Sequence, residues 1–182
     1  MRLSFFLCFF LLQGCSLLTL PIQNKGAGEF WNDSKISMKM TMELMKDQPL
    51  GLNRVYSLIH RGRVLLVGIV PSQHVKEYAV SIVKKVTDVK EVIDDIVVGK
   101  EGVCDYLSDS IAAKKISTQL LLHPDIHSTN YQVTVSDQTA YILGEAQSSK
   151  ELERVIQCVE DVKGIHTLKH YITVIPPQKK TP

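Results

Sequence analysis

One stretch of the chain decides the fold: residues 62–72, which read Gly62-Arg63-Val64-Leu65-Leu66-Val67-Gly68-Ile69-Val70-Pro71-Ser72. This pattern predicts a β-strand that ends on glycine and passes directly into a helix. The same pattern recurs at residues 139–148, and Gly68 and Gly144 are 76 residues apart. At both glycines we expect that a side chain would strain the turn or lift the helix off the sheet.

A shift of 76 residues aligns far more than the two glycines. It pairs charged and apolar positions along the whole repeat, including Asp33 with Asp109, Lys39 with Lys115, Leu44 with Leu120, Val86 with Val162 and Ile96 with Ile172. A fixed offset across six predicted elements indicates a tandem duplication of one small domain. Two copies of about 65 residues each also fit a chain of 182 residues.

Each copy is predicted to run helix, strand, strand, helix, strand. The first helix should begin at the N-cap pair Asp33-Ser34 and end near Lys46, with Met38, Met42 and Met45 thickening its apolar side. A hairpin at residues 53–70, a helix from residue 71 and a strand at 92–98 follow, and residues 109–175 repeat the order. The expected fold class is α+β, with a three-stranded mixed sheet packed on two helices in each copy.

The unit resembles the BON domain, which is found in bacterial envelope proteins. The resemblance rests on the turn and strand at residues 61–68 and on the valine rhythm of residues 86–92, which residues 162–168 repeat. It covers residues 33–98 and 109–175, and it departs from the family pattern where Gln138 replaces the glycine of the hairpin turn. The predicted organisation is a signal peptide (1–14), a tether (15–32), BON domain 1 (33–99), a linker (100–108), BON domain 2 (109–175) and a flexible tail (176–182).

The first twenty residues have the features of an export signal. Met1-Arg2 precedes about ten apolar residues, which are too few to span a bilayer. Leu12-Gln13-Gly14-Cys15 resembles the lipobox of bacterial lipoproteins, although Gln13 stands where a small residue is usual. That resemblance implies cleavage before Cys15, acylation of Cys15, and sorting to the outer membrane on its periplasmic side. The alternatives are an ordinary signal peptide with an incidental cysteine, or an uncleaved anchor extending through Leu20.

Two further cysteines, Cys104 and Cys158, remain in the expected mature chain. In an oxidising periplasm they could form a disulfide. Their positions are not equivalent in the two copies, so the alternative is that Cys158 is a small buried thiol.

The sequence contains no pattern that predicts catalysis. Its six histidines form no His-Glu-x-x-His motif, and Cys-x-x-Cys and glycine-rich phosphate loops are absent from the sequence. A net charge of +2 gives no concentrated basic surface for nucleic acid. We therefore expect a non-enzymatic protein without a cofactor, a catalytic residue or a metal.

A binding surface is predicted on the first helix of the second copy. There Leu120-Leu121-Leu122 stands where the first copy has Leu44-Met45-Lys46, and Lys114-Lys115 precedes it. Basic residues beside exposed leucine suit an anionic bilayer, and the family resemblance implies that the second BON domain contacts lipid through this helix. The candidate phospholipid-binding residues are Lys114, Lys115, Thr118, Leu121 and Leu122. Alternatively, Leu121 and Leu122 pack against the first copy or the linker.

Two functions are consistent with these features. The first is a lipid-anchored periplasmic protein that binds anionic phospholipid and supports envelope integrity. The second is a protein-interaction adaptor that docks an envelope assembly or secretion partner on an exposed sheet face or edge.

Overall fold

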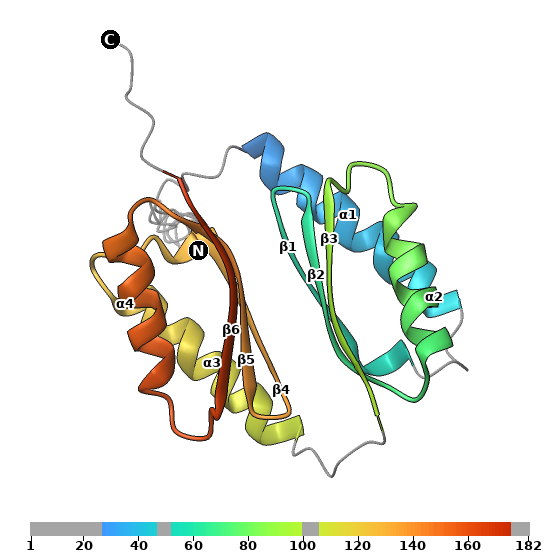
Figure 1. Cartoon of the computed structure of the whole chain (residues 1–182). Coiled ribbons are helices and arrows are strands. Elements are labelled where there is room, and N and C mark those ends of the chain that lie inside the picture. Colours follow the sequence, from blue (N-terminus) through green and yellow to red (C-terminus); the bar gives the residue numbers. More distant parts are fainter. Residues whose placement is uncertain (1–26, 47–51, 100–105, 176–182) are drawn as a thin grey trace, which may run out of the picture.

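The computed structural model describes residues 27–46, 52–99 and 106–175 (Figure 1). The elements of the first copy are α1 (Ala27–Lys46), η2 (Leu52–Arg54), β1 (Val55–His60), β2 (Arg63–Val70), α2 (Gln73–Lys84) and β3 (Glu91–Val98). Those of the second copy are α3 (Tyr106–Leu122), η3 (Ser128–Asn130), β4 (Tyr131–Ser136), β5 (Thr139–Ala146), α4 (Ser149–Glu160) and β6 (Thr167–Val174). The two copies have the same order of helices and strands.

Both sheets are three-stranded and mixed, as predicted. In the first, β2 lies between β1 and β3 and pairs antiparallel with β1 and parallel with β3. The second repeats this arrangement with β5 at its centre. The register is repeated as well, because Val55 pairs with Gly68 and Tyr131 pairs with Gly144. The duplicated α+β fold is therefore confirmed.

The start of each copy differs from the prediction. Helix α1 begins at Ala27, so Asp33 lies inside it and is not its N-cap. The buried Asp33 carboxylate instead accepts hydrogen bonds from the backbone N–H groups of Arg61 and Gly62, at 2.9 and 2.8 Å. The equivalent Asp109, inside α3, accepts from Asp137 and Gln138 at 2.8 and 3.1 Å. The aspartate repeated in the two copies thus joins each first helix to its hairpin turn through two hydrogen bonds.

The two repeated glycines are required for a different reason than expected. Gly68 lies within β2, not at its end, and has φ +139°. A Cβ at Gly68 would lie 2.0 Å from the carbonyl oxygen of Arg54, and one at Gly144 would lie 2.2 Å from that of Asn130. Each glycine therefore accommodates the backbone that leads into the neighbouring strand, and the following helix has no part in the clash.

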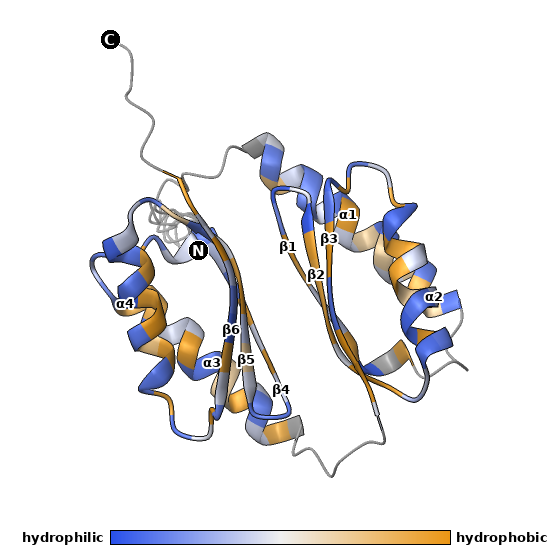
Figure 2. Ribbon diagram, in the orientation of Figure 1, coloured by the Kyte–Doolittle hydropathy of each residue, from blue (hydrophilic) through white to orange (hydrophobic). Residues whose placement is uncertain are grey.

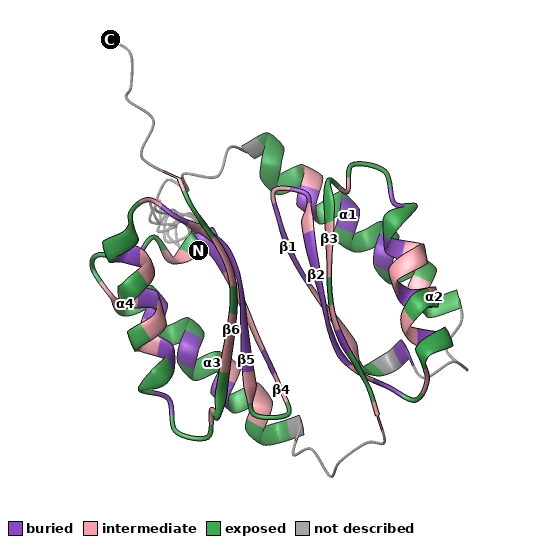
Figure 3. Ribbon diagram, in the orientation of Figure 1, coloured by how far each residue is buried: buried purple, intermediate pink, exposed green. Residues whose placement is uncertain are grey.

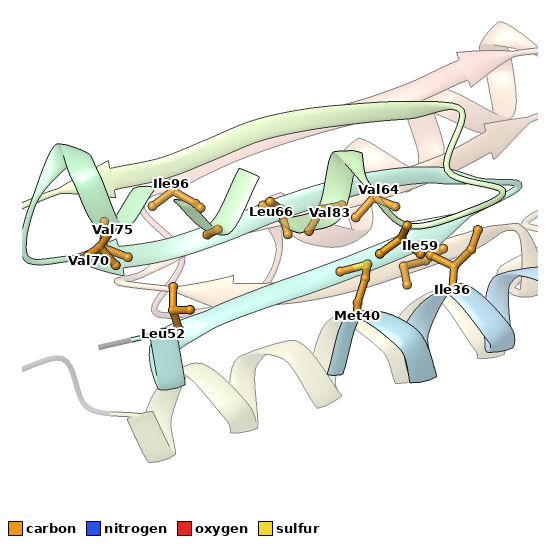
Figure 4. Close-up of a cluster of buried hydrophobic side chains, with 12 residues drawn as sticks. Ile36, Met40, Leu52, Ile59, Val64, Leu66, Val70, Val75, Val83 and Ile96 are labelled. Carbon is orange, nitrogen blue, oxygen red and sulfur yellow. The ribbon is translucent and has the colours of Figure 1, made fainter. Parts of the chain in front are cut away.

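Alternate residues of each central strand serve two different cores. On β2, Val64, Leu66 and Val70 face the helices and pack with residues such as Ile36 and Met40 of α1 (Figure 4). Each copy thereby covers one face of its own sheet.

Serine residues cap the second helix of both copies. The Ser72 hydroxyl accepts a hydrogen bond from the N–H of Val75, and the Ser148 hydroxyl accepts one from the N–H of Glu151.

The other faces of the two sheets cover one another. Leu58, Leu65 and Val67 of the first copy pack with Tyr141 and Leu143 of the second. The helices lie outside, which gives a layered arrangement of helices, sheet, sheet and helices (Figure 1), and the central strands are buried (Figure 3). Burial on both faces explains why residues 64–70 form a continuous apolar run instead of alternating. Within the described residues neither sheet leaves a whole face exposed, so the adaptor hypothesis depends on the strand edges.

Several predicted segments lie outside the described residues: the signal peptide, Cys15, most of the tether and linker, Cys104 and the tail at 176–182. Among the described residues, no helix combines the length and apolar character that crossing a membrane requires.

Candidate functional site

Helix α3 has a buried side and an exposed side that are both partly apolar. Ala112, Ile116 and Leu120 recur at helical spacing and pack in the core of the second copy. The five predicted phospholipid-binding residues lie on the opposite side, within about 120° of one another at 3.6 residues per turn. All five are exposed: Lys114, Lys115, Thr118, Leu121 and Leu122.

The two leucines are among the most exposed apolar side chains in the described part of the chain. Leu121 is 67% exposed and Leu122 is 75% exposed. The alternative, in which they pack against the first copy, is therefore wrong for the described residues. Their neighbour Thr118 donates its hydroxyl hydrogen to the carbonyl oxygen of Lys114, at 2.8 Å.

An open cavity of about 920 Å³ adjoins this side of α3. Lys114 and Thr118 line it together with Ser117 on the same helix. The facing wall comes from the first copy and includes Arg54 and Tyr56. No sequence pattern pointed to Arg54 and Tyr56, because only the packing of one copy on the other brings them to α3.

The cavity lies beside a seam between the two sheets. Edge strands β1 and β4 meet there, and the side-chain oxygen of Gln132 accepts a hydrogen bond from the N–H of Ile59 at 2.9 Å. Helix α1 packs beside β1 and α3 beside β4, whereas α2 and α4 pack near β3 and β6. We refer to the surface formed by α1, α3 and the edges of β1 and β4 as the seam side.

The structure corrects the prediction for the methionines of α1. Met38, Met42 and Met45 do not extend the buried side of the helix, because they are 59%, 59% and 60% exposed. A helical phase taken from the buried pair Ile36 and Met40 would have placed all three on the opposite side. Trp31, expected in the tether, also lies in α1 and is exposed.

Polar contacts hold the two copies together around the apolar interface. Asp95 of β3 accepts hydrogen bonds from Lys169, at 2.6 Å, and from the hydroxyl of Tyr171. Burial and the contact with Asp95 raise the pKa of Tyr171, and the hydrogen bond to Asp95 raises the pKa of Lys169. An ion pair between Arg61 and Glu145, at 2.6 Å, joins the copies elsewhere.

A buried carboxylate stabilises the second copy internally. Glu151, on α4, accepts hydrogen bonds from the backbone N–H groups of His127 and Gln147, both at 2.8 Å. Burial alone would raise the pKa of Glu151, but these hydrogen bonds outweigh it and leave the pKa lowered. The carboxylate is therefore a fixed structural anion that satisfies the loop before β4 and the start of α4.

The described residues include no group of three or more His, Cys, Asp or Glu side chains that could hold a metal ion. Cys158 is half-buried and carries a thiol whose pKa is raised by burial and by Asp161. Its proposed partner Cys104 lies outside the described residues, so that disulfide stays a prediction.

A family model described as BON domain matches residues 32–100 and 108–176. An uncharacterized protein in the gshII 5' region of Anaplasma centrale is 31% identical over 143 residues, which are 78% of this chain and 93% of that protein. Osmotically-inducible protein Y of Escherichia coli is 27% identical, over 79% of this chain and 73% of that protein. Outer membrane lipoprotein DolP of Haemophilus influenzae is 26% identical, over 65% of this chain and 63% of that protein.

Proposed function

Because the chain belongs to the BON domain family, we propose that it is a non-catalytic, lipid-anchored envelope protein that binds anionic phospholipid and supports outer-membrane integrity. Its similarity to a protein named outer membrane lipoprotein supports the location, at 26% identity. The lipobox-like tetrad that ends at Cys15 supports the anchor. The anchor holds the protein at the periplasmic face of the outer membrane, so the binding surface meets the bilayer to which the chain is attached.

The observation that carries the lipid-binding proposal is the exposed side of α3. Leu121 and Leu122 expose most of their surface to solvent, although a folded protein gains by covering such side chains. Lys114 and Lys115 lie on the same side, about two turns before them. This is the usual pattern of binding at a membrane interface. The apolar residues enter the edge of the hydrocarbon region, and the neighbouring cations contact the anionic headgroups.

The adjoining cavity suits a phosphate headgroup. Its walls carry the cations of Lys114 and Arg54, whereas the hydroxyl groups of Ser117 and Thr118 in the same lining donate to the carbonyl oxygens of Ala113 and Lys114. Lysine and arginine cations bind phosphate oxygens, and the volume of the cavity is of the size that binds small ligands. In this proposal the headgroup occupies the cavity, while Leu121 and Leu122 contact the acyl region.

Sedimentation with vesicles tests the α3 site. The chain without residues 1–15 retains every described helix and strand and lacks the acyl anchor. We expect it to sediment with vesicles that contain phosphatidylglycerol and to lose this binding in the Leu121→Glu, Leu122→Glu variant. Both leucines are exposed, so the variant should keep its circular dichroism spectrum. Unchanged sedimentation of the folded variant would remove the assignment of this site.

The anchor is tested separately. Mass spectrometry of the exported protein should find an acylated Cys15 at the amino terminus, and Cys15→Ala should release the protein from the membrane fraction. An unmodified amino terminus would contradict the anchor but would leave the α3 site untouched.

The adaptor function stays as the second candidate, restricted to strand edges. On β3, Val97 and Val98 are 48% and 42% exposed. Within the described residues β3 pairs on one side only, with β2, so its other side could accept a strand from a partner. Two results together would favour this candidate. The protein would form a stoichiometric envelope complex that the Val97→Lys, Val98→Lys variant does not form, and it would show no affinity for vesicles.

A further inference from the structure

Helix α1 is apolar on two opposite sides, and only one of them is covered. Ile36 and Met40 are at most 1% exposed and pack in the first core. Trp31, Met38, Met42 and Met45 are 59–65% exposed. At 3.6 residues per turn these four lie within about 60° of one another, opposite Met40. We call them the α1 stripe.

The α1 stripe is more than a scatter of single exposed residues, which any protein surface has. It runs for about 21 Å along the helix axis at 1.5 Å per residue. Phe30 extends it, with its ring edge-on to Trp31 and the centroids 6.3 Å apart. The hydropathy of the helices is shown in Figure 2.

Exposed large apolar residues on the described helices are confined to the first helix of each copy. They come from α1 and α3, and α2 and α4 have none. Both helices flank the β1–β4 seam, and Phe30 and Met38 of α1 line a cavity there together with Gln132 of β4. The α1 stripe also occupies the positions that the 76-residue repeat equates with the candidate site on α3, where the pairs are Trp31 and Leu107, Met38 and Lys114, Met42 and Thr118, and Met45 and Leu121.

We propose that the α1 stripe is a second membrane contact, through which the first copy inserts apolar side chains into the bilayer that α3 meets with its lysines. This inference rests on the proposed lipid-binding function and extends it to the first copy. The division of roles follows from the repeat, because the first copy carries methionine where the second carries Lys114 and Thr118. Flexible, apolar methionine adapts readily to an irregular partner such as acyl chains.

Two observations favour a bilayer as the occupant. Lys35 and Lys39 are exposed and border the stripe along one side, which suits an anionic surface, and tryptophan at one end suits the interface between headgroups and hydrocarbon. The second observation is the short length of chain between the expected anchor and α1. Only eleven residues separate Cys15 from Ala27, and they span at most about 40 Å when fully extended. An anchor at Cys15 therefore keeps α1 close to the membrane.

Trp31 is the only tryptophan of the chain and reports on the stripe directly. We expect the chain without residues 1–15 to show a blue shift of its tryptophan emission on addition of vesicles of phosphatidylcholine and phosphatidylglycerol. Lipids brominated on the acyl chains should quench this emission. The affinity of the Met38→Gln, Met42→Gln, Met45→Gln variant for such vesicles should fall at least about tenfold, because the variant loses the apolar side chains that insert into the bilayer.

The matched control is Val174→Gln, which removes exposed apolar surface from β6 and should leave vesicle binding unchanged. Thermal unfolding of each variant checks that the fold is kept. Sedimentation that depends on Leu121 and Leu122, with Trp31 unshifted and unquenched and the methionine variant binding normally, would overturn this inference and leave the α3 site standing.

Other outcomes separate the two proposals further. Normal binding by the leucine variant together with weak binding by the methionine variant would support the α1 stripe and remove the α3 site. A lipid-free shift of Trp31 emission that grows with protein concentration would identify a second copy as the occupant and overturn the inference. Absence of vesicle binding altogether would overturn both proposals.

Discussion

The Asp33 carboxylate accepts a hydrogen bond from the Gly62 amide at 2.8 Å, although 29 residues separate them in the chain. Asp109 and Gln138 repeat this contact in the second copy, at 3.1 Å. The contact joins the first helix of each copy to the hairpin turn, and both of these precede the second helix and the third strand in the sequence. It therefore orients α1 and α3, the two helices on which the candidate surfaces lie.

Asp33→Ala is expected to lower the free energy of unfolding by about 2–3 kcal/mol, because two N–H groups in a buried site lose a charged acceptor. Asp109→Ala should cost about 1 kcal/mol, because its hydrogen bonds are exposed and water can replace the carboxylate. Urea unfolding of the two variants measures the difference. Equal losses would show that burial does not set the strength of this contact.

The hairpin turns of the two copies offer a stabilising change. Arg61 and Gly62 have φ +52° and +81°, and Asp137 and Gln138 have +49° and +58°. Glutamine is strained in this left-handed region, so Gln138→Gly should raise the free energy of unfolding by roughly 0.5–1 kcal/mol. The reciprocal Gly62→Gln should lower it, since a Cβ there also lies 3.0 Å from the Asp88 carbonyl oxygen. Thermal unfolding is sufficient to compare them, and a destabilised Gln138→Gly variant would contradict this reading of the turn.

Acid should weaken the protein through Glu151. The pKa of Glu151 is lowered in the folded state from its ordinary value of 4.5, so its stabilising contribution is present above about pH 4.5. That contribution is lost as the pH falls below 4.5 toward the lowered folded pKa. The stability difference between the wild type and Glu151→Gln should therefore be largest near neutral pH and shrink in acid. Melting curves across this range measure it, and a constant difference would argue against the assignment.

Alkali should weaken the contact between the copies. The pKa values of Tyr171 and Lys169 are raised in the folded state from 10.0 and 10.5. Above about pH 10 the unfolded chain releases these protons first, so the folded state loses stability as the pH rises toward the raised values. Tyr171→Phe should flatten the pH dependence of stability above pH 10. A double-mutant cycle with Asp95→Asn measures the coupling, and additive effects would show that the two side chains do not interact.

The sequence predicted the repeat, the order of elements and both mixed sheets, because strand-forming runs, turn residues and helical spacing are local signals. It misplaced the role of Asp33, since the acceptor role depends on a turn 28 residues away. Gly68 was recognised as necessary, yet the clash that requires it comes from Arg54 on a neighbouring segment. Local patterns identify such residues, whereas their partners become visible only in three dimensions.

The candidate site was predictable only in part. The exposed side of α3 followed from comparing the copies, because Leu122 replaces Lys46 at an equivalent position. The cavity could not be predicted, since Arg54 and Tyr56 belong to the other copy. The methionines of α1 were assigned to the wrong side because their hydrophobicity was weighed without the helical phase set by Ile36 and Met40.

The sheet-on-sheet interface also bears on how such a chain arose. A solitary ancestral unit would have presented Leu58, Leu65 and Val67, or their equivalents, to water, and would have been driven to self-associate. Fusing two units in tandem replaces a concentration-dependent homodimer with a permanent intramolecular pair. Once the pairing was secured within one polypeptide, the first helices of the two copies were free to diverge, α1 toward methionine and α3 toward lysine.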